Sequence, residues 1–515
     1  MAQTWTHLNT AITNIAINVM TIAIITLAAS VSILGAVVGL PEAWQTGGPL
    51  WILAGLALMP CLLFAMRKFR AAFIPGLIFV GYLKNDQAKG LSISDPSIIA
   101  LLLLYGTIFL DLLITMTGKG RSWGRELFVQ WKGIAAFGLL AAVITISYLY
   151  SPAPVYGLDK LTRFLVISGV LFVAPLILIR KDDDLRHFTL AMVVFATLLS
   201  IRLLFGVTDS SVFNPHGGAV LSDSRDVTQI GAGQVVGVGL LWLLFCPYCN
   251  LRSFFLVASV PLLCAALIAS VARGPVLSFA AILIPFMLLR RVRAAVTSTK
   301  VWLPVLILGL LAFAVCVYWL QQQGAASEKF ATKRAEIEEV LGGSSTPTYT
   351  AGKRLTLYRW ALGMFSAKPV TGWGVGGWSY YAFDRDMPAY PHNLILEVAA
   401  EEGVIGLAAL ATLLLTVLLT MRRIWRASRD LTFIAPVFAF SLLVTMTSGD
   451  INVNRPLWLW CGMVFALAGI MEQRRRRNKA MDWKTYPSDS FMDPPTFKIV
   501  PSSFGSLEAS LRKQS

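Results

Sequence analysis

The sequence holds four histidines, and His392 is the one whose surroundings best suit acid–base chemistry. It follows Tyr390 and Pro391 and lies about one helical turn before Glu397, where a long apolar segment begins. An imidazole at such a boundary could accept a proton from a hydroxyl group, because its ordinary pKa is close to neutral pH. The alternative is a loop histidine whose ring only hydrogen-bonds to the backbone. We take His392 as the candidate general base.

Three arginines are candidates for binding a diphosphate. Arg273 and Arg225 are two of the few cationic residues in the short connections on the same side of the expected membrane as His392. Guanidinium groups bind phosphate oxygens through paired hydrogen bonds and neutralise their charge. Arg354 and Arg359 are too widely spaced to stack on one helix face, and we favour Arg354 as the third ligand. Each arginine could instead extend to the membrane surface or pair with a neighbouring aspartate.

Two shorter patterns resemble ligand sites but are better explained as turns. Residues 372–377 fit the G-x-G-x-x-G spacing of dinucleotide-binding loops, yet no strand is expected before them, so we expect tight turns packed under Trp373 and Trp378. Asp384 and Asp386 resemble a metal-binding carboxylate pair, but no third ligand is near, so we expect a solvated turn. The sequence therefore predicts no metal and no other cofactor.

The composition indicates an integral membrane protein. Of the 515 residues, 56% are hydrophobic and 14% are charged, and the mean hydropathy is +0.67. Soluble domains contain about 45–50% apolar and about 25% charged residues, so a water-soluble enzyme, a coiled coil and a disordered chain are excluded. The net charge of +16 would suggest a nucleic-acid partner in a soluble protein. In a membrane protein, Lys and Arg in cytoplasmic loops explain it, and we expect no nucleic acid.

The apolar segments predict an all-α fold, a polytopic membrane bundle of about 12–14 transmembrane helices, each with about 20 mostly apolar residues. The third expected span is short for a membrane crossing. The expected spans are residues 13–39, 50–66, 71–83, 97–117, 133–150, 158–179, 188–205, 230–246, 253–271, 275–290, 302–320, 394–420, 431–448 and 456–472.

The basic residues indicate the orientation of this bundle. Lys and Arg gather in alternate loops, which places both termini in the cytoplasm. One large, partly helical periplasmic loop then separates two groups of spans. The expected organisation is an N-terminal transmembrane bundle (1–320), the periplasmic loop domain (321–393), C-terminal transmembrane helices (394–472) and a disordered cytoplasmic tail (473–515).

Three motifs follow one another after Arg354. They read Pro369-x-x-Gly372-Trp373-Gly374, Pro391-His392-Asn393 and Glu402-Gly403-x-x-Gly406. In this order they resemble the signature of the bacterial O-antigen ligase and O-antigen polymerase superfamily of membrane polysaccharide ligases and polymerases. The many spans and the single large loop late in the chain are also similar to that family. The similarity in motifs covers about residues 220–410.

The resemblance implies a metal-independent glycosyltransferase of the bacterial inner membrane, with its active site facing the periplasm. Such an enzyme transfers a saccharide from an undecaprenyl-diphosphate donor to a glycolipid or carrier-linked acceptor among the membrane lipids, as in lipopolysaccharide or exopolysaccharide biosynthesis. A direct displacement would invert the anomeric carbon. The family histidine falls on His392, and the family arginines fall on Arg273 and Arg225.

Two alternatives stay open. An O-antigen or exopolysaccharide polymerase of the same superfamily would transfer the saccharide to another carrier-linked repeat. A polysaccharide or lipid transporter would favour internal repeats, broken helices and ionisable residues near the bilayer midplane. The few candidates for such residues, Arg163, Asp111 and Arg202, lie toward the ends of expected spans.

Overall fold

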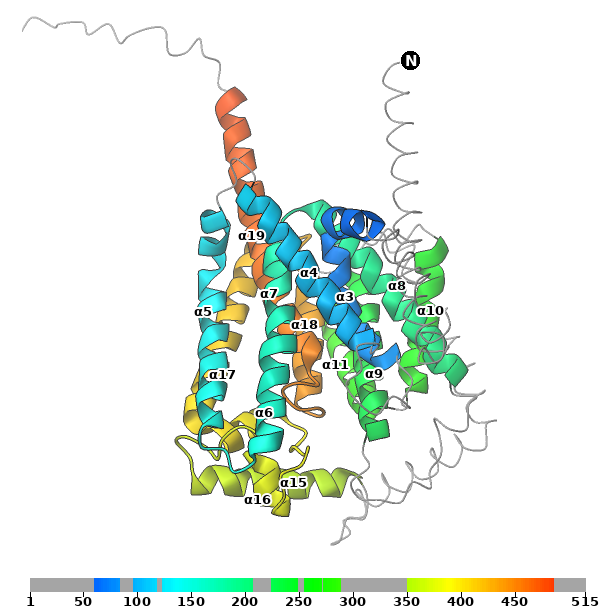
Figure 1. Ribbon diagram of the computed structural model, residues 1–515. Coiled ribbons are helices and arrows are strands. Elements are labelled where there is room, and N and C mark those ends of the chain that lie inside the picture. The colour runs from blue at the N-terminus through cyan, green and yellow to red at the C-terminus, as the bar shows by residue number, and fades with distance from the viewer. Residues whose placement is uncertain are drawn as a thin grey trace, which may run out of the picture. The chain divides into compact units, whose positions relative to one another are not determined.

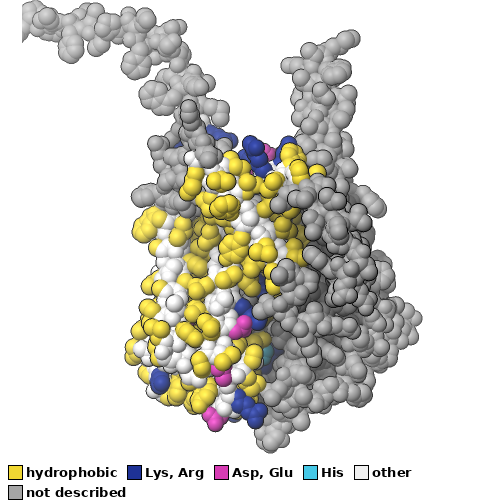
Figure 2. All heavy atoms as spheres, viewed as in Figure 1, with side chains coloured by type: hydrophobic (Ala, Val, Ile, Leu, Met, Phe, Trp, Pro, Cys, Tyr) yellow, Lys and Arg dark blue, Asp and Glu magenta, His cyan; other side chains and the backbone are white. Residues whose placement is uncertain are grey.

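The computed structural model of the chain describes residues 60–83, 96–117, 123–206, 224–248, 254–270, 272–288 and 350–485. Every regular element in these residues is helical, which confirms the all-α fold class. Within these described ranges, six helices are long and apolar enough to cross a membrane, and five shorter apolar helices accompany them. Figure 2 shows hydrophobic side chains over most of the described surface on one face of the molecule. The chain is therefore a polytopic helical membrane protein.

Figure 1 shows how the labelled elements are arranged. A helical segment at 60–68 precedes the first of them. The elements are η1 (Arg70–Ala72), α3 (Phe73–Leu83), α4 (Pro96–Thr117), α5 (Trp123–Tyr148), α6 (Pro154–Arg163), η2 (Phe164–Ser168), α7 (Gly169–Leu178), α8 (Asp182–Gly206), α9 (Ser224–Phe245), α10 (Phe254–Ala269), α11 (Arg273–Leu288), α15 (Thr350–Ala367), α16 (Gly377–Phe383), α17 (Leu394–Ala427), α18 (Ile434–Thr445) and α19 (Arg455–Thr485).

The helices follow the expected spans closely where the structure describes them. The expected span 97–117 is α4, and 158–179 is the continuous run from α6 to α7. The expected spans 13–39 and 302–320 lie outside the described residues, as does most of 50–66. Several helices are longer than their apolar cores, since polar residues at their ends also favour helix. One of them, α19, continues to Thr485 and so covers the first part of the expected tail.

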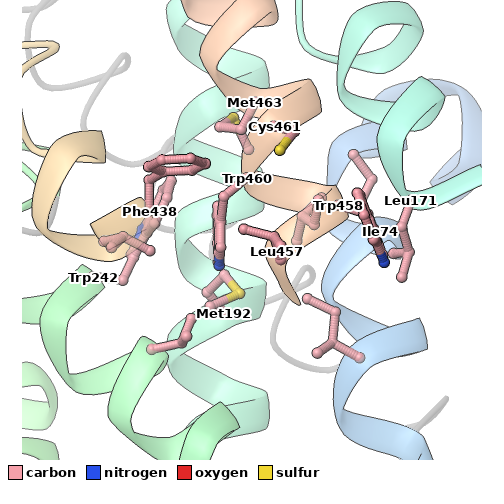
Figure 3. Packing of buried hydrophobic residues seen from close by; sticks show 14 of the residues in the cluster. Ile74, Leu171, Met192, Trp242, Phe438, Leu457, Trp458, Trp460, Cys461 and Met463 are labelled. Atoms are coloured by element: carbon pink, nitrogen blue, oxygen red, sulfur yellow. The ribbon is translucent and has the colours of Figure 1, made fainter. Parts of the chain in front are cut away.

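The chain divides into two compact units, Met1–Met471 and Glu472–Ser515. Inside the first unit, aromatic rings on the first part of α19 pack between neighbouring helices (Figure 3). The Trp460 ring stacks on Trp242 of α9 at 5.2 Å, and Trp242 meets Phe433 edge-on at 4.9 Å. The Trp242 indole also donates a hydrogen bond to the Thr189 hydroxyl (3.1 Å). These contacts fix α8, α9 and α19 against one another.

At the end of the bundle where α8 begins, a group of paired charges ties several helices together. Arg70 contacts Asp111 of α4 (2.5 Å) and Asp184 of α8 (2.8 Å), and Arg180 also contacts Asp111. Two guanidinium groups and two carboxylates balance in charge, which is the condition for partial burial in an apolar bundle. Asp111 is therefore a structural residue near a helix end, as the sequence indicated, and not an isolated charge at the bilayer midplane.

At the opposite end, α17 is interrupted at Gly403, whose φ of 65° and ψ of −155° are not helical. The turn at 369–374 hydrogen-bonds to the backbone freed by this break. The bonds run from Trp373 N–H to Ala400 O (3.1 Å), from Gly374 N–H to Glu401 O (2.7 Å), from Val404 N–H to Pro369 O (2.8 Å) and from Ile405 N–H to Val370 O (3.3 Å). The expected tight turn thus positions the segment 369–374 against α17.

We predict that Gly374→Ala destabilises the protein. Gly374 has a φ of 89°, and a Cβ there would lie 2.6 Å from Ser151 Cα and 2.7 Å from Ser147 O. Forcing an L residue into this conformation costs about 1–3 kcal/mol before the clash is counted. Thermal unfolding of the purified protein in detergent measures the loss.

Gly138→Ala is the matched control, because Gly138 lies within α5 and its added Cβ would meet nothing within 4 Å. That variant should unfold at an equal or slightly higher temperature, since alanine favours helix by about 0.5–1 kcal/mol over glycine. Equal stability of the two variants would contradict the proposed role of the turn.

Candidate functional site

The candidate site lies at the end of the bundle where α6 and α17 begin. Here α15 runs across the helix ends, and α16 lies beside it (Figure 1). A small core of Ala361, Met364, Trp378 and Ala400 joins α15 and α16 to α17. The Trp373 indole donates a hydrogen bond to Met364 O (3.0 Å). The segment 350–393 thus packs against α17 through a small apolar core, which holds the residues between α16 and α17 in place.

His392 occupies a strained backbone position directly before α17. Its φ is 58°, in the left-handed region that non-glycine residues rarely adopt. The next residue, Asn393, is the N-cap of α17 and accepts a hydrogen bond from Leu396 N–H (3.1 Å). Its side-chain amide also donates to Met446 O (3.0 Å), after the end of α18. Asn393 therefore joins the start of α17 to the loop between α18 and α19.

The imidazole of His392 is partly buried and lies 4.7 Å from the Tyr390 ring. Its Nδ1 is buried and has no hydrogen-bond partner among the described residues. Burial lowers the pKa of His392 to about 4, and the positive charge of Arg354 adds to this effect. The ring is therefore neutral at physiological pH, the state in which an imidazole can accept a proton.

The structure brings Arg354 within electrostatic range of His392, since its charge acts on the imidazole. Arg354 lies in the first part of α15 and is half-buried, whereas Arg359 on the same helix is exposed. The two arginines therefore differ in their surroundings, as their spacing suggested. Of the two, Arg354 is the one whose charge acts on the candidate base.

Arg273 is the first residue of α11, and a chain of contacts joins its neighbourhood to His392. A Cβ on Gly274 would lie 3.0 Å from the Thr447 hydroxyl. Thr447 directly follows Met446, whose carbonyl is bound by Asn393. The backbone at the start of α11 thus lies beside the loop that holds the His392 segment. The direction of the Arg273 side chain is outside the described structure.

Arg225 lies at the start of α9. Further along α9, a Cβ on Gly233 would lie 2.7 Å from the Ser270 hydroxyl, so this helix runs beside the junction of α10 and α11. Arg225 is about two turns, or roughly 12 Å, from that contact. The contacts of the described chain do not connect Arg225 to His392, and its side chain is also outside the described structure.

Sequence reasoning missed a buried ionic cluster beneath the site. Lys160 Nζ of α6 contacts Glu397 Oε1 (2.5 Å) and Glu401 Oε2 (2.6 Å) of α17, and each side chain is 1% exposed. The spacing of the two glutamates places both on one face of α17. The spacing of the two glutamates was visible in the sequence, and so was the scarcity of Lys and Arg in the connections on this side. Nothing in the sequence, however, paired the glutamates with Lys160.

The expected solvated turn at Asp384–Asp386 has a different role. Asp386 is exposed, but its carboxylate accepts hydrogen bonds from the backbone N–H groups of Val155 (2.8 Å) and Tyr156 (2.9 Å). These are orphan donors in the first turn of α6, so a residue far along the chain caps this helix. Among the residues that the structure describes, no group of three His, Cys, Asp or Glu side chains is placed to hold a metal ion.

Comparison with known proteins bears on what this arrangement does. No curated protein matches the chain significantly. Residues 257–411 match the family model described as O-antigen ligase. The matched region contains α11, α15, α16 and the first part of α17, and with them Arg273, Arg354 and His392. Over this part of the chain, the match supports the resemblance to the O-antigen ligase and O-antigen polymerase superfamily that the motifs indicated.

Proposed function

We propose that the protein transfers a saccharide from undecaprenyl diphosphate to a lipid-linked acceptor at the periplasmic face of the bacterial inner membrane. The observation that carries this proposal is a neutral, partly buried His392 on which the charge of Arg354 acts. A proton acceptor within the electrostatic range of a cation suits a reaction that deprotonates an alcohol and expels a phosphate. The family match supports the same class of reaction.

The donor diphosphate would be held by Arg354, Arg273 and Arg225. Guanidinium groups bind phosphate oxygens bidentately and stay charged at every physiological pH. The start of α11 adds the positive end of a helix dipole at Arg273. As the bond to the sugar breaks, negative charge grows on the diphosphate, and fixed cations at a water-poor surface stabilise it.

His392 would act as the general base. It accepts the proton of the acceptor hydroxyl while that oxygen bonds to the anomeric carbon, and the bond from this carbon to the diphosphate oxygen breaks. The diphosphate leaves with the bonding electrons, and the anomeric centre is inverted. The balance of atoms and charge needs no metal, because the arginines neutralise the leaving group.

Arg354 links donor binding to the strength of this base. In the free protein its charge contributes to the low pKa of His392. A bound diphosphate would neutralise that charge, so the pKa of His392 should rise toward its ordinary value near 6.5. His392 would then be a stronger base only when the donor is present.

The proposed orientation has both termini in the cytoplasm and the segment 321–393 in the periplasm. It is supported by the excess of Lys and Arg in alternate loops. The described ends of the bundle fit this division. Exposed Arg422, Arg423 and Arg426 lie at the end of α17 that is far from His392.

The acceptor separates the two functions that fit this site. A ligase would use a glycolipid, and a polymerase would use another carrier-linked repeat. Analysis of surface glycans in a deletion strain distinguishes them. Polymer that accumulates on its carrier would indicate the ligase, and single unpolymerised repeats would indicate the polymerase. A normal glycan profile would contradict both.

The transporter alternative has less support, because Arg163 pairs with Asp159 at an exposed position and Asp111 pairs with two arginines.

We predict that His392→Ala lowers kcat for glycan transfer in reconstituted membranes by about 10²–10⁴-fold, the usual contribution of a general base. Thermal unfolding in detergent confirms that the variant is folded. Transfer at the wild-type rate would refute the assignment of His392.

The pH dependence of the wild-type enzyme gives a second prediction. The acid limb of kcat/KM reports the free enzyme and should fall near pH 4, because the base must be neutral and its pKa is about 4. The acid limb of kcat reports the donor complex and should lie at higher pH. Coincident limbs would contradict the effect of donor binding on His392.

A third prediction concerns Arg354. Arg354→Ala should weaken donor binding and raise the acid limb of kcat/KM above pH 4, because it removes one cause of the low pKa of His392. Arg354→Lys should retain most of the shift, since the charge remains. Arg359→Ala is the control from the exposed side of the same helix and should leave both quantities unchanged. Equal behaviour of the two alanine variants would contradict the role of Arg354.

A further inference from the structure

The residues before His392 and the residues after it are both attached to the short helix α6. Before His392 in the chain, the Asp386 carboxylate accepts hydrogen bonds from the backbone N–H groups of Val155 (2.8 Å) and Tyr156 (2.9 Å). The N-cap residue of α6, Ala153, makes no side-chain hydrogen bond, and the first turn of this helix has no acidic residue of its own. The first turn of α6 and the segment before His392 are thus held together.

On the C-terminal side, Lys160 attaches the same helix to the first turns of α17. Its ammonium contacts Glu397 Oε1 (2.5 Å) and Glu401 Oε2 (2.6 Å). All three side chains are 1% exposed, so solvent does not screen these contacts. Removing one partner of such a buried pair leaves an uncompensated charge, which makes the attachment strong.

The same cluster extends to the loop that Asn393 binds. The Asn452 side chain donates a hydrogen bond to Lys160 O (2.9 Å), and Glu397 Oε1 accepts a hydrogen bond from Ile451 N–H (3.3 Å). Asp450 closes the turn by accepting Asn452 N–H (2.9 Å). The loop after α18, the start of α17 and α6 therefore form one connected unit around His392.

The backbone of His392 explains why this attachment matters. A non-glycine residue at a φ of 58° is strained, and such a conformation persists only when the surrounding structure holds it. Both neighbouring segments are fixed to α6, so the two attachments restrict how residue 392 can relax. A change in the backbone at this residue would move the imidazole from its partly buried position.

We propose that Asp386 and Lys160 are positioning residues that hold His392 in its strained conformation through α6. Neither residue touches the reacting groups. The catalytic meaning of this proposal rests on the proposed function, but the positioning itself can be measured without glycan transfer.

The experiment compares Asp386→Ala and Lys160→Met with the wild-type chain in detergent. Diethyl pyrocarbonate acylates neutral imidazole, and mass spectrometry of peptides reports the reaction at His392 alone. In the wild type, the rate of acylation at His392 should reach half of its maximum near pH 4, the pKa of His392. This pH is the midpoint of the reaction. In both variants the freed ring should gain solvent and move away from Arg354, so the midpoint should rise toward 6.5.

Asp159→Asn is the matched control. Asp159 directly precedes Lys160 on α6 but pairs with Arg163 at the protein surface, where the two side chains are 44% and 56% exposed. Exposed pairs contribute little, so this variant should keep the wild-type midpoint and the wild-type kcat. Because Asp386 lies in an exposed turn, its variant should fold even if Lys160→Met does not.

Kinetics give the second readout. In the folded variants kcat should fall about tenfold to hundredfold while KM for the donor changes little, because a displaced base affects the transition state more than donor binding. An unchanged midpoint in Asp386→Ala would overturn the proposal, whatever happens to kcat. If the wild type shows the expected midpoint but transfers no glycan, the proposed function fails and the positioning stands.

Discussion

The break in α17 at Gly403 leaves peptide groups without helical partners, and the outer part of the fold depends on how they are satisfied. In an apolar environment an unpaired peptide group costs several kcal/mol. The turn at 369–374 supplies the partners by pairing its backbone with the chain on both sides of the break. This pairing brings two backbones very close together, which only glycine permits at Gly372 and Gly403. Gly374 lies equally close to a third segment, the backbone at Ser147 and Ser151. The motifs that mark the family thus include residues that build the site without touching a substrate.

Charges are used differently at the two ends of the bundle. At the end where α8 begins, Arg70, Asp111, Arg180 and Asp184 balance one another, and their arrangement explains their partial burial. At the other end, Lys160 pairs with Glu397 and Glu401, but Arg354 acts on a neutral histidine instead of a carboxylate. A cation beside a neutral base is not a stabilising pair, so that arrangement fits a site that binds an anion.

The sequence predicted the helices well because each needs only its own apolar residues. The expected span 97–117 differs from α4 by one residue at its start. The sequence did not predict α15, since Thr350–Ala367 is too polar for a span. The pairing of Lys160 with Glu397 and the capping of α6 by Asp386 join residues far apart in the chain, which periodicity cannot reveal. For the site, the sequence indicated candidate residue types, whereas their neighbours required the fold.

The position of the break within α17 has a consequence for substrate access. The residues after it, 404–427, extend roughly 36 Å as a helix, slightly more than the roughly 30 Å of bilayer hydrocarbon. With 404–427 as the part that crosses the hydrocarbon, the interruption would fall where the acyl chains end and the headgroups start. An isoprenoid carrier keeps its phosphates at that same depth while its tail remains dissolved in lipid. In the proposed function, a lipid-linked donor would therefore reach His392 by diffusing sideways within the leaflet, and its saccharide would already face water.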